Sequence, residues 1–220
     1  MPLELRTVTH RYGPGSPPVL RGLSFVFPED CSLAVVGPSG SGKTTLLAIA
    51  GLLLAPSEGE VRIDGKEVSR GQAGELRTRL FGWVFQTVNV LSGRSVEDNA
   101  MLSLLARGTR EEDARAAAQG ALATVGLGEF GERRANSLSG GELQRLCIAR
   151  AVAAKPRFLL ADEPTGQLDG ATTERVTRAL IEGRPKGTTL LMVTHDPLVA
   201  AQCDLTLALQ DGQLSIGGMA

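Results

Sequence analysis

The sequence is poor in the residue types that mark several large classes of protein. Three cysteines, two histidines, one tryptophan and one tyrosine occur among its 220 residues. Cys31, Cys147 and Cys203 are far apart and match no metal-ligand spacing. We therefore expect reduced thiols that pack as small hydrophobic side chains, and neither a disulfide framework nor a zinc site.

Long apolar runs are also missing. The longest, residues 45–56, is far too short for a transmembrane helix. The N-terminus, residues 1–12, carries charges and lacks the apolar core of a signal peptide. We expect a cytoplasmic chain that meets a membrane only through a partner.

The sequence shows no excess of positive charge. It contains 23 basic and 24 acidic side chains, for a formal net charge of -1. Proteins that bind nucleic acid usually carry a basic excess, so this balance argues against that class. A hydrophobic fraction of 42% argues against disorder and is enough for one large domain, or for one domain with an inserted subdomain.

Local patterns predict an α/β chain with a helical segment in its middle. Strands are predicted at residues 3–10, 23–27, 32–36, 60–64, 157–161 and 188–193. Residues 96–154 have a helical pattern, with an alanine-rich amphipathic run at 111–125, and further helices are predicted at 43–53 and 171–181. Asp64-Gly65 predicts a hairpin turn, and Asp211-Gly212 predicts a closing hairpin within residues 205–215.

The strongest motif is a complete phosphate-binding loop between a predicted strand and a predicted helix. It consists of Gly37, Pro38, Ser39, Gly40, Ser41, Gly42, Lys43 and Thr44, and Thr45 follows it. Glycines let the backbone N–H groups approach phosphate oxygens, and the helix N-terminus adds partial positive charge. Lys43 is expected to reach the β- and γ-phosphates of ATP, and the Thr44 hydroxyl to bind Mg²⁺.

Two acids end a second apolar strand. Residues 157–161 are followed directly by Asp162 and Glu163. Carboxylates at the end of a buried strand are costly without a cation or proton as partner, and open α/β sheets bind ligands at these strand ends. We expect Asp162 to hold Mg²⁺ and Glu163 to act as general base on the attacking water.

Residues 138–145, Leu-Ser-Gly-Gly-Glu-Leu-Gln-Arg, form a second glycine-containing helix start. Ser139 is expected to cap the helix with Glu142 three residues later, while Gly140 and Gly141 leave N–H groups exposed to an anion. This run resembles the signature sequence of ABC-transporter ATPases. The resemblance implies a head-to-tail homodimer in which each ATP lies between the phosphate-binding loop of one subunit and the signature of the other.

Further residues match the motifs of this family in its usual order. By resemblance, Gln86 contacts Mg²⁺ or water, Asp169 crosses the dimer interface, and His195 contacts the γ-phosphate. Tyr12 is similar to the aromatic residue that stacks on adenine. The alternative for Tyr12 is that it packs under the turn at residues 14–18.

The resemblance also implies a fold. A P-loop NTPase RecA-like core is expected, with an N-terminal antiparallel β-subdomain and an inserted α-helical subdomain. The single nucleotide-binding domain spans residues 1–220: core and β-subdomain at 1–86 and 156–220, and helical subdomain with the signature at 87–155. The sequence departs from the family pattern at Asp30-Cys31, at Thr44 and at Gln167, and none of these changes removes a catalytic group.

Within the family, residues 81–86 with Asn89 and residues 161–169 are most similar to one subgroup. It contains MacB-like efflux pumps, lipoprotein-release ATPases, peptide and haem exporters, and FtsE. The implied function is to energise export, or extraction from the membrane, by a separate permease at the cytoplasmic face of the inner membrane. Residues 96–99 resemble the segment that docks against the permease. Val88, Val90, Leu91 and Val96 are expected to line a shallow groove that receives a short cytosolic helix of the permease, and the alternative is that these apolar side chains are buried inside the protein. The transported substrate is not encoded in this chain.

Three other functions share part of this evidence. ATPase subunits of ABC importers have the same catalytic motifs. A soluble ABC ATPase acting on nucleic acid or the ribosome usually has two ATPase units or a long coiled-coil insertion, and neither fits 220 residues. A small-molecule kinase or GTPase would use the phosphate-binding loop alone, which leaves the signature run and the Asp162-Glu163 pair without a role.

Overall fold

The computed structural model describes residues 2–166 and 168–217, so Gln167 lies outside the described residues. The chain forms two compact units. Unit 1 comprises residues 1–77 and 189–220, and unit 2 comprises residues 78–188. These units are defined by their internal contacts. The predicted division into a catalytic core with β-subdomain (1–86 and 156–220) and a helical subdomain (87–155) is a different one, and it stays a prediction.

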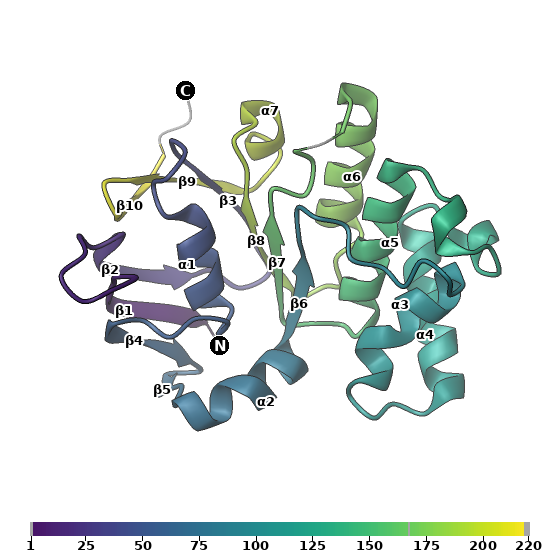
Figure 1. The fold of residues 1–220 in the computed structure, drawn as a ribbon, viewed down its shortest axis with the longest axis horizontal. Coiled ribbons are helices and arrows are strands. Elements are labelled where there is room, and N and C mark those ends of the chain that lie inside the picture. The colour runs from purple at the N-terminus through teal and green to yellow at the C-terminus, as the bar shows by residue number, and fades with distance from the viewer. Residues whose placement is uncertain (1, 167, 218–220) are drawn as a thin grey trace. The chain divides into compact units, whose positions relative to one another are not determined.

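Unit 1 contains an antiparallel sheet (Figure 1), as expected for the β-subdomain. Its strand order is β2-β1-β4-β5, with β1 Leu3–His10, β2 Leu20–Phe27, β4 Glu58–Ile63 and β5 Lys66–Glu67. Leu3 and Leu5 of β1 are buried on one face. The register then shifts at Thr7, whose φ is 47°, so that Val8 and His10 are buried as well.

The second sheet of unit 1 contains the strand before the phosphate-binding loop. Its order is β10-β9-β3-β8, with β3 Ser32–Val36, β8 Thr189–Val193, β9 Leu205–Gln210 and β10 Gln213–Ile216. Strands β8 and β9 run parallel to β3, and β10 runs antiparallel to β9. Leu33, Ala34 and Val35 of β3 are fully buried, as expected for an inner parallel strand.

Two helices of unit 1 border this sheet. Helix α1 spans Lys43–Ala50 and contacts β8 and β1, while α7 spans Pro197–Ala200 and contacts β3. Helix α1 is three residues shorter than predicted, because Gly51 ends it and Leu52 adopts a φ of 61°.

Both predicted hairpins of unit 1 are confirmed. Asp64 and Gly65, with φ of 58° and 71°, join β4 to β5, and Asp211 and Gly212, with φ of 51° and 76°, join β9 to β10. Two successive positive φ values are typical of the two-residue turn whose twist suits antiparallel strands.

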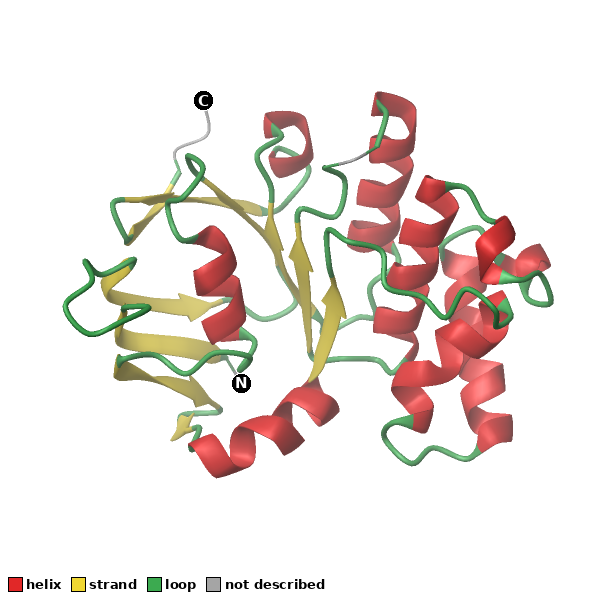
Figure 2. Cartoon of the chain, in the orientation of Figure 1, coloured by secondary structure: helices red, strands yellow, loops and turns green. Residues whose placement is uncertain are grey.

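Unit 2 is mainly helical (Figure 2). It contains the parallel strands β6 Phe81–Val84 and β7 Phe158–Asp162, the helices α3 Val96–Leu105, α4 Glu111–Thr124, α5 Gly140–Ala153 and α6 Gly170–Glu182, and the short 3-10 helices η1 Gly128–Phe130 and η2 Ala135–Ser137. Helix α5 contacts α3, α4 and α6, and its Leu146, Ile148 and Ala149 are fully buried. The helix that carries the signature is therefore the centre of this unit.

Helix α2, Arg70–Leu80, contains the boundary between the two units. All 11 of its residues are described, and each is exposed or half-buried. Its first turn is held by Gln72, whose Oε1 accepts from the Ser69 hydroxyl at 2.9 Å, and Arg77 donates to the Leu52 carbonyl at 2.7 Å. Sequence patterns did not predict α2 or β6.

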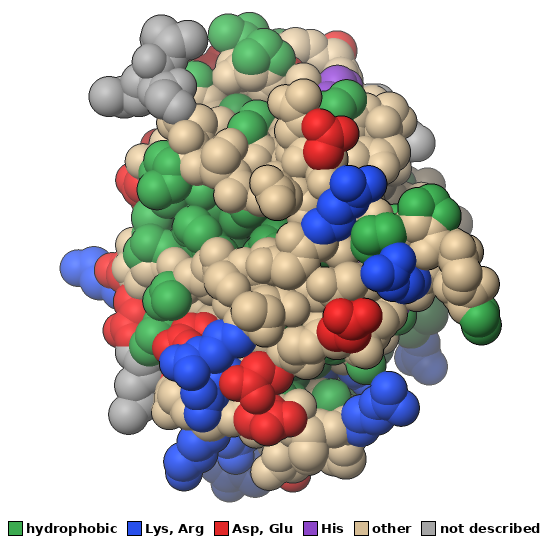
Figure 3. Space-filling model, turned by 90° about the vertical axis from the view of Figure 1, so that its left-hand side faces the viewer, with side chains coloured by type: hydrophobic (Ala, Val, Ile, Leu, Met, Phe, Trp, Pro, Cys, Tyr) green, Lys and Arg blue, Asp and Glu red, His purple; other side chains and the backbone are tan. Residues whose placement is uncertain are grey.

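The surface agrees with the balanced charge of the sequence. On the face shown in Figure 3, Lys and Arg side chains are interspersed with Asp and Glu. Within the part of the chain that the structure describes, every helix is too short or too polar to span a lipid bilayer.

Candidate nucleotide site

The loop between β3 and α1 can form only because glycine stands at two positions. Gly37 has a φ of 156°, and a Cβ there would lie 2.3 Å from the carbonyl oxygen of Leu209. Gly42 precedes α1 with a φ of 99°, and a Cβ there would lie 2.8 Å from Cγ1 of Val19. Any side chain at either position would overlap its neighbour, so the backbone path depends on both glycines.

Polar groups of this loop turn inward. Lys43 is 8% exposed, and its Nζ donates to the carbonyl oxygens of Gly37 and Pro38 at 2.9 Å each. The Ser41 Oγ is buried and has no hydrogen-bond partner among the residues described. A buried hydroxyl beside an ammonium group and the start of a helix fits a phosphate, because that ligand accepts hydrogen bonds from all three.

Tyr12 lies beside the same helix. Its hydroxyl and the Thr45 Oγ1 are 2.8 Å apart, and its ring meets the His10 ring edge-on at 5.0 Å. Because Tyr12 is 68% exposed, a flat aromatic face remains accessible next to α1. That position suits stacking on a purine.

His195 leaves the same sheet edge as the loop. Val193 of β8 pairs with Val35 of β3, and the N–H of Thr194 donates to the Val35 carbonyl at 3.2 Å. His195 is exposed directly after this pair, and Asp196 then caps α7 by accepting from the Leu198 N–H at 2.8 Å. Thr44, in the first turn of α1, is exposed as well.

Unit 2 brings Gln86 and Glu163 together. Glu163 follows β7 with a φ of 44°, a conformation that costs about 1–3 kcal/mol and that the surroundings must hold in place. A Cβ on Gly166 would lie 3.3 Å from Glu163 Oε2 and 3.4 Å from Gln86 Nε2. The Gln86 amide and the Glu163 carboxylate therefore lie against the same side of Gly166, close to each other. Asp162, one residue earlier, is half-buried at the end of β7.

The start of α5 confirms the predicted capping box. The carboxylate of Glu142 accepts from the Ser139 N–H at 2.7 Å and from the Ser139 hydroxyl at 2.8 Å, while the Ser139 Oγ accepts from the Glu142 N–H. These hydrogen bonds, the one from the Ser139 backbone first, lower the pKa of Glu142. Ser139 itself is exposed.

The two glycines of the signature have different surroundings. Gly140 is exposed, and a Cβ there would meet nothing within 4 Å. Gly141 is buried, and a Cβ there would lie 2.2 Å from Cγ2 of Thr172 on α6. Gly141 is therefore needed for helix packing, a role that the sequence alone did not indicate.

Asp169 is the N-cap of α6. Its carboxylate accepts from the N–H and the hydroxyl of Thr172 at 2.9 and 3.0 Å, and the first of these bonds is the main cause of its lowered pKa. The spacing Asp-x-x-Thr could have predicted this cap. The role of Asp169 across a dimer interface stays a prediction.

Sequence reasoning missed the residues that brace the segment after Gln86. Gln144 of α5 donates to the Phe85 carbonyl at 3.2 Å, and Arg150 donates to the Asn89 carbonyl at 2.5 Å. Asn99 binds both the N–H and the carbonyl of Leu91, at 2.7 and 3.0 Å. These three polar side chains stand within apolar helical patterns, which indicates that they form hydrogen bonds inside the protein. The sequence does not show with which residues, because most of the partners lie far away in the chain.

The candidate residues divide between the units. Unit 1 carries Tyr12, Gly37, Pro38, Ser39, Gly40, Ser41, Gly42, Lys43, Thr44, Thr45 and His195. Unit 2 carries Gln86, Ser139, Gly140, Gly141, Asp162, Glu163 and Asp169. Unit 1 thus carries the residues expected to bind phosphate and to stack on a base, and unit 2 carries carboxylates and an amide of the kind that binds water or a cation.

Comparison with known proteins settles the family. The model of the family described as ABC transporter matches residues 20–166, which include the phosphate-binding loop, the signature and Glu163. The chain belongs to the ABC transporter family. It is the ATP-binding subunit of this family, and such subunits are ATPases.

Individual relatives agree with this assignment. The MacB macrolide export ATP-binding/permease protein of Marinobacter nauticus is 38% identical over 96% of the chain, which spans 34% of that relative's length. The LolD lipoprotein-releasing system ATP-binding protein of Anaeromyxobacter dehalogenans is 41% identical over 98% of the chain and 93% of its own length. The dimeric structure of MJ0796, a bacterial ABC transporter cassette, matches with a TM-score of 0.82 and 33% identity over 99% of this chain and 100% of that one. The expected cassette fold, with its antiparallel subdomain and helical insertion, is confirmed.

Proposed function

We propose that this ATPase energises export, or extraction from a membrane, by a permease subunit. The relatives that support this direction are named for macrolide export and for lipoprotein release. Import remains the alternative, because the residues that bind and hydrolyse ATP are the same in both directions.

In the proposed mechanism, unit 1 binds the nucleotide. Tyr12 stacks on adenine, and the loop N–H groups, Ser41 and Lys43 hold the phosphates. The support is the inward-pointing ammonium group of Lys43 and the buried Ser41 hydroxyl. Thr44, Gln86 and Asp162 would hold a Mg²⁺ ion, which would supply positive charge to neutralise the phosphate oxygens.

Activation of the attacking water is assigned to groups of unit 2. A water between Gln86 and Glu163 attacks the γ-phosphorus and passes its proton to Glu163, while His195 contacts the γ-phosphate, so that ADP and inorganic phosphate are formed. The observation that carries this assignment is the approach of Glu163 Oε2 and Gln86 Nε2 to the same side of Gly166.

A head-to-tail dimer completes each site in this proposal. Ser139 and the N–H group of Gly140 would bind the γ-phosphate held by the other subunit. The exposure of both residues supports this, as does the similarity to a cassette whose structure is dimeric.

The decisive experiment replaces the carboxylate of Glu163 by an amide. Glu163→Gln should keep ATP binding and lower the hydrolysis rate by about 10²-fold or more, because the general base is lost. Light scattering should then show a dimer in the presence of ATP. Glu112→Gln, on the exposed face of α4, is the matched control and should hydrolyse ATP at the normal rate. Normal turnover in Glu163→Gln would exclude the general-base assignment.

The segment after Gln86 is proposed to receive a cytosolic helix of the permease. The Leu91 side chain is 50% exposed, while hydrogen bonds to Asn99 fix its backbone. An apolar side chain is thus held at the surface in a fixed position, which supports a role in docking. Val96, included in the groove expected from the sequence, is fully buried and cannot contribute to a surface. The groove is therefore assigned to Val88, Val90 and Leu91.

A charge in this groove tests the assignment. Leu91→Glu should leave basal ATP hydrolysis unchanged and abolish co-purification with the permease. Leu53→Glu, in unit 1, places the same charge at a position with 48% exposure and should not affect permease binding. If both variants bound the permease equally well, the docking site would lie elsewhere.

A further inference from the structure

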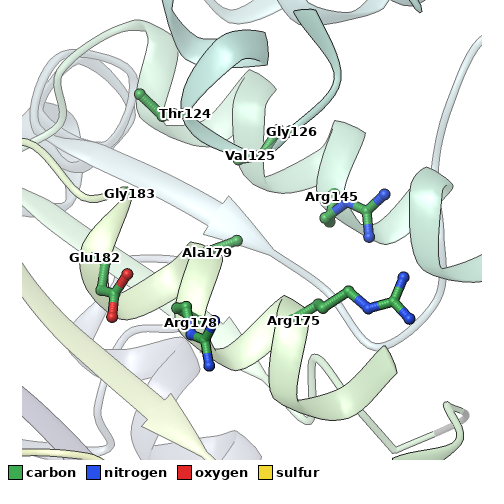
Figure 4. Close-up of a pocket in the computed structure, with 9 residues that line it drawn as sticks. All are labelled: Thr124, Val125, Gly126, Arg145, Arg175, Arg178, Ala179, Glu182 and Gly183. Atoms are coloured by element: carbon green, nitrogen blue, oxygen red, sulfur yellow. The ribbon is translucent and has the colours of Figure 1, made fainter. Parts of the chain in front are cut away.

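Unit 2 contains a pocket that the proposed ATPase mechanism does not use. It has a volume of about 480 Å³ and is lined by residues at the end of α4 and on α5 and α6. The lining residues are Thr124, Val125, Gly126, Arg145, Arg175, Arg178, Ala179, Glu182 and Gly183 (Figure 4). We call it the arginine pocket.

The packing of α5 on α6 places two of its arginines side by side. A Cβ on Gly141 would overlap Thr172, so the two helices pack closely at this point, and one turn further along each helix stand Arg145 and Arg175. Figure 4 shows their guanidinium groups together at one end of the pocket. Two cations at one place repel each other unless an anion lies between them.

The nearby carboxylates are engaged elsewhere. Glu174 pairs with Arg178 at 2.7 Å, and Glu142 is held by Ser139. Arg145 lowers the pKa of Glu142 only as the last of several causes. The Nε of Arg145 is buried and has no hydrogen-bond partner within residues 2–166 and 168–217. A buried N–H donor without an acceptor costs free energy. The Arg145 Nε–H therefore indicates a ligand that supplies a hydrogen-bond acceptor.

The opposite end of the pocket has the opposite charge. Figure 4 shows the Glu182 carboxylate there, and the C-terminal ends of α4 and α6, at Val125 and Gly183, add partial negative charge. Between the two ends the lining includes the apolar side chains of Val125 and Ala179. Arg175 and Glu182 are seven residues apart on α6, which corresponds to about 10 Å along the helix axis.

We propose that the arginine pocket binds an acidic segment of a partner polypeptide. A carboxylate of the segment lies between Arg145 and Arg175, and a basic side chain of the segment reaches Glu182. In an extended peptide, side chains two residues apart lie on the same face about 7 Å apart, and the flexible Glu and Lys side chains cover the remaining distance, so the matching sequence is Glu-x-Lys in extended conformation. A free phosphate would satisfy the arginines alone, whereas such a segment also covers the apolar surface and the negative end.

The probe is a blocked peptide, acetyl-Ala-Glu-Ala-Lys-Ala-amide, added to the full chain without nucleotide. The Nε–H resonances of Arg145 and Arg175 should shift and saturate as the peptide is added. Arg175→Gln, at an exposed position, should weaken binding about tenfold or more, because a hydrogen bond between charged groups is lost. Because ATP is absent, failure here would leave the proposed ATPase mechanism untouched.

Controls make the outcome decisive. Arg178→Gln removes one charge from the same rim, but one already paired with Glu174, and should change the affinity less than about threefold. Arg175→Glu should reject the probe and accept a peptide with Lys in place of Glu. Arg145→Gln changes a partly buried residue, so its thermal unfolding is measured before its peptide binding. If this variant does not fold, the test of the proposal rests on Arg175→Gln and Arg175→Glu.

Three results would overturn the proposal. The first is the lack of a saturable shift with the peptide. The second is an equal loss in Arg178→Gln and Arg175→Gln, which would indicate attraction by net charge alone. The third is binding of inorganic phosphate at the same concentration as the peptide, with the same shifts, which would make the pocket a site for small oxyanions.

Discussion

The first turns of α1 and α5 invite comparison, because each follows a glycine-containing motif and each was expected to bind phosphate. Helix α1 begins after Gly42, which has no side chain to cap its N–H groups, and the buried Ser41 hydroxyl lies beside them. Helix α5 begins at Ser139, whose N–H and hydroxyl are already bound by the Glu142 carboxylate.

The difference concerns where the negative charge comes from. At α1 the chain places a lysine close in sequence to the Ser41 hydroxyl, which has no hydrogen-bond partner among the described residues, so an anion must come from outside. At α5 the chain supplies its own anion, which satisfies the cap and offsets the partial charge of the helix end. We infer that α1 is the primary phosphate site and that α5 contributes only when a phosphate is already held nearby.

The largest expected effect tests this division of labour in a dimer. Chains with Lys43→Ala and chains with Ser139→Arg should each be inactive, because every site then lacks one group. A mixture of the two should regain ATPase activity, because the mixed dimer has one site with both groups intact. A steady-state phosphate-release assay measures this, and two wild-type preparations mixed in the same way are the control. An inactive mixture whose mixed dimers are detected would exclude shared sites.

Next in size is the effect of alanine at the first glycines of the two helices. Gly42→Ala forces a side chain into a backbone with φ of 99° and against Val19, which should weaken ATP binding to the single chain at least about tenfold. Gly140→Ala enters open space and should leave that binding unchanged. Titration calorimetry below the dimerising concentration measures both. Equal losses would mean that the two helix starts contribute alike to binding by one chain.

A smaller effect on stability is expected at Gly141. Gly141→Ala brings a methyl group against Cγ2 of Thr172 and should lower the free energy of unfolding by about 1–3 kcal/mol. Thr172→Ser in the same chain removes that Cγ2 but keeps the hydroxyl that donates a hydrogen bond to Asp169. The second change should therefore restore most of the lost free energy of unfolding. Urea denaturation gives the comparison. If the second change restored nothing, Gly141 would be needed for something other than packing.

The smallest effect is a pH dependence from Glu142. Its pKa is lowered on folding from its ordinary value of 4.5, so its stabilising contribution is complete above that pH and is lost as the pH falls through the folded pKa. Glu142→Gln should therefore narrow the difference between melting temperatures at pH 7 and pH 4. Glu112→Gln, at an exposed position on α4, is the matched control, and an identical pH profile for both variants would contradict the capping role.

Much of the nucleotide site could be predicted from the sequence, because its motifs are short and local. The capping box at Ser139 and both hairpin turns depend on spacing within four residues, and the structure has them where expected. Helix α2 was not predicted, because Gly71 and Gly74 lower its helix propensity. It also buries no apolar face, so its sequence lacks the helical spacing of apolar residues from which a helix is predicted. The packing role of Gly141 and the pairing of Arg145 with Arg175 depend on which helices meet, and a local pattern does not contain that information.

Helix α2 has a consequence for how the molecule opens. With each of its residues exposed or half-buried, its backbone hydrogen bonds are protected by little except the helix itself. Its amide hydrogens should exchange with solvent through local opening, at a free energy far below that of global unfolding. Arg70, Arg77 and Arg79 make it a site for limited trypsin digestion at the boundary between the two units. The first cut would therefore fall between residues 70 and 80 and separate the phosphate-binding loop from Glu163, the proposed general base, while both units are still folded.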